Sequence, residues 1–533
     1  MVLVVYLLFT ALALLATYLV KAYLDRWTFR GFGSIPTVAV RLPYVGNALH
    51  IDMTKCHRVL SDFARTYGPV FRIRLYKEEI LVLNDYKSIH DALIMKGADF
   101  AGRPPMYRTK HAERNIHSIV WQTYTDKLLF LRKTVLRSMR MYGSGLEKLE
   151  EKCRPDIHEM MERFSATGGE PADPWDIIYD AVCNVMLCLT LGSRVDYDSI
   201  NFQRIKDMNS LFNDTFGSGR ARRLDHIPFL RIFRDDCYCR MQEALKLRDA
   251  FWEAELEKLK KSEEDRDCVV QHLFDSLGDV RTMKSQNGSR PTTSGISKTG
   301  TTEAPGRDVQ PELNVTPTTV KEVFTNLILA GTDTTATALT CFLLVLLHYP
   351  DVQDRLWQEI NTVVGVNHLT SLADREALPY VEATLLELLR FISHVPLAVP
   401  HYTTCDTSVL GKSVPANTTV YINLWALHHD ETFWNDPWRF DPTRFLDGHG
   451  KLVPPSHENR RRLLPFGAGR RVCLGETLAK NRLFLFATAL IQHFHFQAEN
   501  PDQLPEVDPR TYEMGLVLHP KRFKLRAIRR QKS

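Results

Sequence analysis

Two things are scarce in this sequence: net charge and closely paired cysteines. Its 533 residues carry a formal net charge of only +5, too small to favour nucleic acid as a partner. The ten cysteines are scattered without any Cys-x-x-Cys pair, which argues against a disulfide framework and indicates a reducing compartment. Apolar residues are plentiful. At 44% hydrophobic and 25% charged, the composition is that of a globular protein with a large core.

Charge is also missing from residues 2–20, where all 19 positions are uncharged. As a helix this run spans roughly 28 Å, enough to cross the hydrocarbon core of a bilayer. Lys21, Arg26 and Arg30 follow it and no basic residue precedes it, so the positive-inside rule predicts a single-pass signal anchor with the body in the cytosol. A cleaved signal peptide is the alternative, but its apolar core is usually shorter and follows a basic segment.

After residue 20, stretches rich in glycine, proline or polar residues separate the segments of the chain. Residues 21–50 are rich in breakers and are expected to form a hinge. Residues 280–316 are nearly free of large apolar side chains, which predicts a disordered insertion. Elsewhere helical periodicity dominates, with two short strands predicted across Val70 to Asn84 and a helix across Glu476 to Phe496. The expected fold class is mainly α with a minor β part, with one catalytic domain over 51–525.

The segment FGAGRRVCLG, residues 466–475, places a cysteine where a thiolate is stabilised. Cys473 lies just before a helix predicted to begin near Glu476, and free N–H groups at a helix start favour negative charge, as do Arg470 and Arg471. A lone cysteine is more often a small buried hydrophobic residue, but flanking glycines and an arginine pair argue against that here. Zinc is disfavoured because no second cysteine or histidine lies at ligand spacing. A single thiolate with an open axial position suits haem iron.

Residues 466–475 resemble, position by position, the haem-binding signature of the cytochrome P450 superfamily, Phe-x-x-Gly-x-Arg-x-Cys-x-Gly. The resemblance implies the cytochrome P450 fold, with haem b as cofactor, Cys473 as its axial ligand and Phe466 among the cofactor-binding residues. Residues 100–109, FAGRPPMYRT, resemble the animal microsomal branch that includes steroid and aryl-hydrocarbon hydroxylases. That branch lies in the endoplasmic reticulum membrane. It receives electrons from NADPH through the flavins of NADPH–cytochrome P450 reductase, with cytochrome b5 as a further donor.

A polar cluster, AGTDTT at 330–335, interrupts an otherwise apolar helix. Gly331 in mid-helix is less favourable than alanine by about 1 kcal/mol, and taken alone the cluster is a tolerated kink. Beside a haem, Gly331 is expected to open room for dioxygen, and a local widening of the helix to free a carbonyl and a hydroxyl. The resemblance implies two catalytic roles: Thr334 donates a hydrogen bond to iron-bound oxygen, and Asp333 links a proton relay to solvent.

A second charged group is assigned a structural role. Glu387 and Arg390, three positions apart, would ordinarily form a surface ion pair. Their leucine neighbours predict burial instead, and buried charges demand full pairing. In the resembling family a Glu-Arg-Arg network, completed here by Arg444, locks the loop that carries the cysteine.

The haem propionates need cationic or hydrogen-bonding partners. Arg132, His401 and Arg471 align with the propionate contacts of the resembling family. One position departs from its pattern, since Leu128 stands where that family usually has tryptophan.

The pocket and the surface give two further predictions. The resemblance implies that Ala330, Val395, Leu397 and Val399 line the substrate pocket, and their apolar side chains favour a lipophilic steroid, fatty acid or xenobiotic. Basic residues are expected to dock an acidic flavoprotein reductase. They form two clusters: Arg132, Lys133, Arg137 and Arg140, and Arg460, Arg461, Arg462, Arg470, Lys480 and Arg482.

Three functions remain open at this point. The favoured one is a monooxygenase that inserts one atom of O2 into a lipophilic substrate. An isomerase or dehydratase on the same fold would need neither a reductase nor external oxygen, and a non-catalytic haem-binding protein would keep only Cys473. The acid–alcohol pair of Asp333 and Thr334 favours the monooxygenase, because only that chemistry needs protons delivered to dioxygen.

Overall fold

The computed structural model describes residues 2–28, 30–39, 45–112, 114–139, 145–217, 221–261, 267–276 and 315–530. The predicted insertion at 280–316 lies outside the described residues except for its last two positions, and so does Arg140.

Helices dominate the described chain, as the periodicity predicted. Their bounds are α1 (Val2–Thr28), α2 (Cys56–Tyr67), α3 (Tyr86–His90), α4 (Tyr107–His111), α5 (Arg114–His117), α6 (Asp126–Met139), α7 (Gly145–Ala166), α8 (Pro174–Leu191), α9 (Ile200–Phe212), α10 (Arg223–His226), α11 (Pro228–Ile232), α12 (Asp236–Lys261), α14 (Pro317–His348), α15 (Pro350–Val363), α16 (Pro379–Ile392), α17 (Leu424–His428), α18 (Glu458–Arg462) and α19 (Glu476–His493).

The minor β part is a four-stranded sheet and three two-stranded pairs. The sheet has the order β1 (Val70–Leu75), β2 (Glu78–Leu83), β6 (Thr419–Ile422), β3 (His401–Tyr402), and β1 and β2 form the hairpin predicted across 70–84. The pairs are β7 (Phe494–Ala498) with β10 (Leu525–Arg529), β4 (Thr407–Val409) with β5 (Lys412–Val414), and β8 (Glu513–Met514) with β9 (Leu518–His519).

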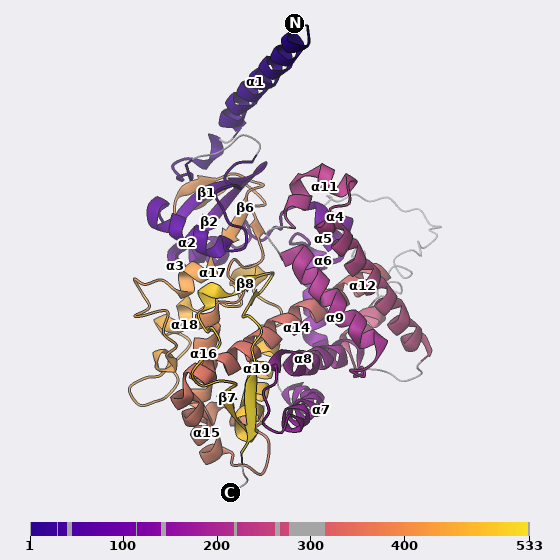
Figure 1. Cartoon of the computed structure of the whole chain (residues 1–533), viewed down its shortest axis with the longest axis vertical. Helices are drawn as coiled ribbons and strands as arrows, with labels where there is room; N and C mark the ends of the chain where they lie inside the picture. The colour runs from indigo at the N-terminus through magenta and orange to yellow at the C-terminus, as the bar shows by residue number, and fades with distance from the viewer. Residues whose placement is uncertain are drawn as a thin grey trace, which may run out of the picture.

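Helix α14 forms the centre of the molecule (Figure 1). It begins at a capping box, in which the Thr316 hydroxyl accepts from Thr319 N–H and the Thr319 hydroxyl from Thr316 N–H, and Pro317 at the first position suits a helix start. It packs most extensively against α8 and also contacts α16 and α19. Both α8 and α14 are apolar and long enough to span a membrane, but most of each is buried in the body. They are therefore core helices.

Helix α1 differs from these two. It projects away from the body in Figure 1, and its side chains from Leu8 to Val20 are exposed and, apart from Thr10 and Thr17, apolar. That described apolar run is shorter than a membrane span.

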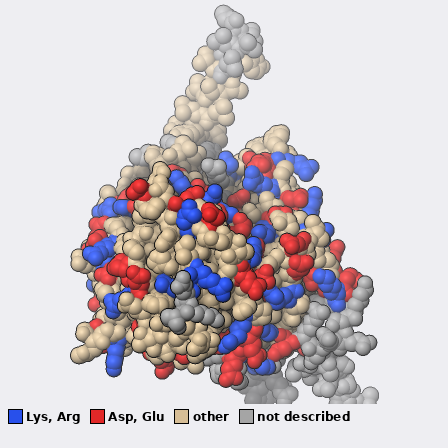
Figure 2. Space-filling model, turned by 60° about the horizontal axis from the view of Figure 1, so that its bottom comes forward, with Lys and Arg blue, Asp and Glu red and all other residues tan. Residues whose placement is uncertain are grey.

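One predicted helix is too long. The C-terminal helix was expected to reach Phe496, but α19 ends at His493 and Phe494–Ala498 form strand β7, paired with β10. The alternation of Phe494, Phe496 and Ala498 with polar residues is the signal of a strand, and the helix prediction ran past it. On the face shown in Figure 2, described basic and acidic side chains are interspersed, in keeping with the small net charge.

Candidate active site

The loop before Cys473 is shaped by two glycines with left-handed backbone. Gly467 and Gly469 have φ of 70° and 69°, a region that other residues rarely adopt. A Cβ on Gly469 would also overlap the carbonyl oxygen of Leu93. The Cys473 N–H donates to the Phe466 carbonyl at 2.9 Å, so the loop folds back on itself and presents the sulfur just before α19.

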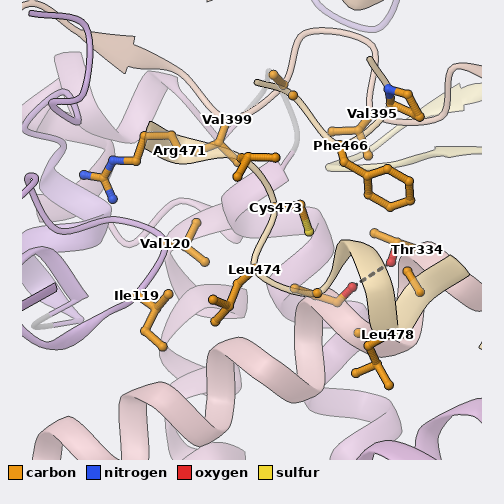
Figure 3. A pocket seen from close by; sticks show the side chains of 18 of the residues that line it. Ile119, Val120, Thr334, Val395, Val399, Phe466, Arg471, Cys473, Leu474 and Leu478 are labelled. Atoms are coloured by element: carbon orange, nitrogen blue, oxygen red, sulfur yellow. Dashed lines mark hydrogen bonds between the residues drawn. The ribbon is translucent and has the colours of Figure 1, made fainter. Parts of the chain in front are cut away.

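The sulfur of Cys473 faces an internal cavity of about 270 Å³. Cys473 is exposed although protein surrounds it, because its accessible surface lines this cavity. Ala330 is exposed for the same reason, in the middle of the largely buried α14. Figure 3 shows the Phe466 ring, the Cys473 sulfur and the Thr334 side chain bordering one space. The ligand loop and α14 thus meet at a single cavity.

The protein alone does not favour a thiolate here. Burial raises the pKa of the Cys473 thiol and Glu476 adds to this, while the Gly475 N–H and Arg132 lower it. The expectation that Arg470 and Arg471 stabilise the thiolate is wrong, because the Arg471 guanidinium donates to the Ala101 and Gln122 carbonyls and Arg470 lies over the Tyr124 ring. A metal ion bound to the sulfur removes the thiol proton outright.

Four cationic or basic side chains meet at one end of the cavity. Arg132 Nη2 donates to the Val472 carbonyl at 2.7 Å, and His401 Nδ1 lies 2.8 Å from the Phe100 carbonyl. Arg471 and Arg103 complete the group. The structure therefore brings together the three residues predicted to hold propionates. Leu128, at the position usual for tryptophan, is buried in the main core.

Arg103 was missed by the sequence analysis, because nothing in its spacing marks it. It is buried, and its guanidinium donates to the Val120 carbonyl at 3.0 Å and the Pro400 carbonyl at 2.8 Å. Burial holds its pKa well below the usual value, and the charges of Arg471 and Arg132 lower it further. Arg103 thus belongs to the same cationic group.

This end of the cavity fits a group with two carboxylates. Burial, with the Arg132 charge, lowers the pKa of Arg471 to about 10, and burial, with Arg103, lowers the pKa of His401 to about 3. No aspartate or glutamate lines the described cavity, and Arg471 Nη1 is buried without a hydrogen-bond partner among the described atoms. Buried cations that repel one another require an anion. The haem propionates would supply it, and the sulfur of Cys473 would supply the axial ligand.

The α14 side of the cavity differs from expectation in one respect. The predicted widening is absent, because α14 is a regular α-helix and the Thr334 hydroxyl donates to the Ala330 carbonyl at 2.7 Å. Gly331 lines the cavity together with Met186 of α8. A Cβ on Gly331 would lie 2.6 Å from Cε of Met186, so the glycine also permits close packing of α8 on α14.

Asp333 points away from the cavity toward β9. Its carboxylate lies 3.3 Å from Nε2 of His519, whose Nδ1 lies 3.2 Å from the Thr337 hydroxyl. Burial lowers the pKa of His519, but the Asp333 charge and hydrogen bond raise it more, and the net shift is upward. Thr334 therefore faces the cavity, whereas its neighbour in sequence, Asp333, pairs with the imidazole of His519. His519 had no local sequence signal.

The Glu387 network is buried and reaches the cysteine loop. The Glu387 and Arg390 side chains are both 0% exposed and joined by bonds of 2.7 and 2.8 Å, and Arg444 Nε lies 3.3 Å from Glu387. Arg390 also donates to the His428 carbonyl, and the His428 ring accepts from Leu464 N–H. Leu464 begins the turn that leads to the cysteine.

Some of the predicted pocket residues and docking residues lie elsewhere than expected. Val395 and Val399 line the cavity with Ala330, but Leu397 packs away from it in the cluster around β1 and β2, and Ala398 takes its place. In the basic clusters Lys133, Arg137, Arg461 and Arg470 are exposed. Arg132 is turned into the cavity, however, and Arg482 is 1% exposed, so neither belongs to a docking surface.

Comparison with known proteins agrees with this geometry. The sequence profile of the cytochrome P450 family matches residues 36–527. Human "Cytochrome P450 1B1" is 32% identical over 98% of this chain and 92% of its own length. The chicken "Steroid 17-alpha-hydroxylase/17,20 lyase" is 31% identical over 98% of this chain and 97% of its own. The chain therefore belongs to the cytochrome P450 family and is a P450 monooxygenase, with animal relatives of the branch that residues 100–109 predicted.

Proposed function

We propose that the protein inserts one atom of O2 into a lipophilic small molecule, with electrons from NADPH through a flavoprotein reductase. One observation carries the proposal: a single cavity holds the Cys473 sulfur, the Thr334 side chain and a buried cationic group that has no carboxylate partner among the described lining residues. Bound haem supplies the iron that activates dioxygen. Cys473 would be its axial ligand, Phe466 would border it, and Arg103, Arg132, His401 and Arg471 would hold its propionates.

Proton delivery is assigned to residues 330–335 of α14, which form the α14 turn. Thr334 presents its side chain to the cavity, and its hydroxyl is held by the Ala330 carbonyl at 2.7 Å. Asp333 and His519 form a neighbouring pair, in which the carboxylate lies 3.3 Å from Nε2 of the imidazole and its charge raises the pKa of His519. We assign Thr334 and Asp333 the catalytic roles and His519 the role of positioning Asp333.

The substrate is proposed to be apolar: a steroid, a fatty acid or a xenobiotic. Ile119, Val120, Leu327, Val395 and Val399 line the cavity, and apolar walls give affinity for such molecules while few polar groups fix orientation. Asn326 is a polar residue of the lining. Its side-chain amide oxygen accepts from Val120 N–H, and its side-chain amide nitrogen donates to the Glu322 carbonyl at 2.6 Å. Its polar atoms are therefore engaged within the protein.

We also propose an anchor at 2–20, a hinge at 21–50 and a catalytic domain over 51–525. The exposed apolar side chains of α1 support the anchor, because such a surface is unfavourable in water. The anchor would place the body on the cytosolic face of the endoplasmic reticulum. There the exposed Lys133, Arg137, Arg461 and Arg470 would contact NADPH–cytochrome P450 reductase or cytochrome b5 through complementary charge.

The test uses the full chain, reconstituted with NADPH and the reductase. A panel of steroids, fatty acids and aryl hydrocarbons is screened by the change each causes in the haem absorption spectrum, and the hits are assayed for hydroxylated product. We expect oxygen from labelled O2 in the product and none without NADPH. Conversion of hydroperoxides without NADPH or O2 would instead indicate the isomerase or dehydratase. Binding of compounds without any turnover would indicate the non-catalytic protein.

A further inference from the structure

Two neighbouring rows of residues on α14 line the cavity that Cys473 faces, and a side chain from another helix holds one of them. Residues four apart lie on the same face of a helix. Ala330 and Thr334 form the first row, and Gly331 and Thr335 form the second. Because the two rows belong to one helix, a contact that fixes Gly331 and Thr335 also fixes the direction in which the Thr334 side chain points.

Arg482 holds that second row. It lies on α19, which begins directly after the Cys473 loop, and its side chain is 1% exposed. Its Nη2 donates both to the Gly331 carbonyl and, at 2.6 Å, to the Thr335 hydroxyl. A single guanidinium thus joins the helix that follows the cysteine to the helix that carries Thr334.

Stability alone does not account for a charged residue at this position. Among the described residues no carboxylate is paired with Arg482, and its Nε and Nη1 have no hydrogen-bond partner. Burial lowers the pKa of Arg482 to about 10, and only the thiols of Cys153 and Cys183 act to raise it. An apolar side chain of similar volume would be as stable or more stable in such a place.

We propose that Arg482 is a positioning residue that fixes the Gly331–Thr335 turn relative to Cys473, and thereby sets where the Thr334 hydroxyl stands on the oxygen side of the haem. The inference rests on the proposed function and deepens it. Arg482 would set the distance and angle between the Cys473 sulfur and the Thr334 hydroxyl. Removal of Arg482 should therefore change oxygen handling without loss of the fold or of the thiolate ligand.

The experiment compares Arg482→Met with wild type in the full-length haem protein. Dithionite-reduced protein is mixed with air-saturated buffer and the rate of haem reoxidation is followed by absorption, which needs no identified substrate. We expect reoxidation to be faster by about tenfold, since misplacing a catalytic group by a fraction of an ångström has effects of this order. The denaturation midpoint should be unchanged or higher, and the reduced carbon monoxide spectrum should remain that of a thiolate-ligated haem.

Thr335→Val provides a second test that leaves the guanidinium in place. It should also speed reoxidation, by less than Arg482→Met, and the double variant should match Arg482→Met alone because both changes break one contact. The matched control is Asn481→Ala on the same helix, which loses the 2.6 Å bond from Arg375 but no contact with α14. Its reoxidation rate should equal that of wild type.

The outcomes are separable. If Arg482→Met and Thr335→Val both reoxidise at the wild-type rate while the thiolate spectrum is intact, the inference is overturned and the proposed function stands. Equal acceleration by Asn481→Ala would also overturn it, because any loosening of α19 would then suffice. A wild-type protein that lacks the thiolate spectrum would overturn the proposed function and the inference with it.

Discussion

The Cys473 loop and the α14 turn face one cavity, but they are held in different ways. The loop takes its shape from its own backbone, through the bond from Cys473 N–H to the Phe466 carbonyl and two glycines with positive φ, and Arg132 and the Glu387 network only tie that shape to the body. The turn is a regular helix positioned by side chains from distant parts of the chain: Met186, Arg482 and His519. The shape of the Cys473 loop, which is the ligand side of the cavity, is therefore encoded locally. The position of the α14 turn, which is the oxygen side, depends on residues far away in sequence.

The largest expected effect is on the ligand side. Cys473→Ala should abolish the thiolate spectrum and all NADPH-dependent turnover, because no other described cysteine lines the cavity. Absorption of the reduced carbon monoxide complex and product formation are the measurements. A variant with the wild-type spectrum would contradict the whole assignment of the site.

Next comes the buried network behind the loop. Glu387→Gln leaves Arg390 buried without its counter-charge and should destabilise the fold by about 3–5 kcal/mol. The measurement is urea denaturation. Glu458→Gln is the control, because it breaks a similar 2.8 Å pair with Arg462 at an exposed carboxylate, where ion pairs contribute little. Equal destabilisation by the two variants would show that burial does not set the strength of the network.

Alanine substitution of one glycine in the Cys473 loop and of one in the α14 turn compares how tightly the two regions are constrained. Gly469→Ala meets a positive φ and the rigid carbonyl of Leu93 and should destabilise the fold by about 1–3 kcal/mol or more. Gly331→Ala meets only the flexible end of Met186, and alanine is the better helix former, so we expect a change within about 1 kcal/mol. Denaturation midpoints of the two variants test this order, and its reversal would show that the turn is the more tightly constrained region.

The same contrast explains what the sequence predicted. The cysteine loop, the hairpin of β1 and β2 and the core helices were predicted because their signals lie within a few residues of one another. Arg103 and His519 were missed, and Arg482 was assigned to the docking surface, because the partners of all three are brought near only by the fold. Leu397 was misplaced for a related reason: the chain reverses at Ala398, where φ is 52°, so alternate apolar residues do not share one wall. The helix widening was inferred from a glycine and a polar cluster within an apolar run, but this chain has a regular helix there, in which the Thr334 hydroxyl is bonded to the Ala330 carbonyl.

The smallest expected effect concerns the pair of Asp333 and His519 and its dependence on pH. Burial lowers the pKa of His519, but Asp333, with smaller contributions from Glu513 and Asp214, raises it above the ordinary value of 6.5. A raised pKa means that the folded protein binds the proton more tightly than the unfolded chain, so the stabilisation is fully present below pH 6.5 and is lost as pH rises through the folded pKa.

His519→Gln should remove this dependence and lower stability at acidic to neutral pH by at most about 1 kcal/mol, since the pair is partly exposed. Asn213 and Thr337 also contact the imidazole, but neither titrates, and the nearby His394 has a pKa lowered to about 4, chiefly by burial, so it stays neutral over this range. Denaturation midpoints of wild type and His519→Gln across this range should therefore converge as pH rises. A gap that stays constant or widens with pH would mean that His519 is not held by Asp333, and the oxygen side of the site would then lose one of its three distant supports.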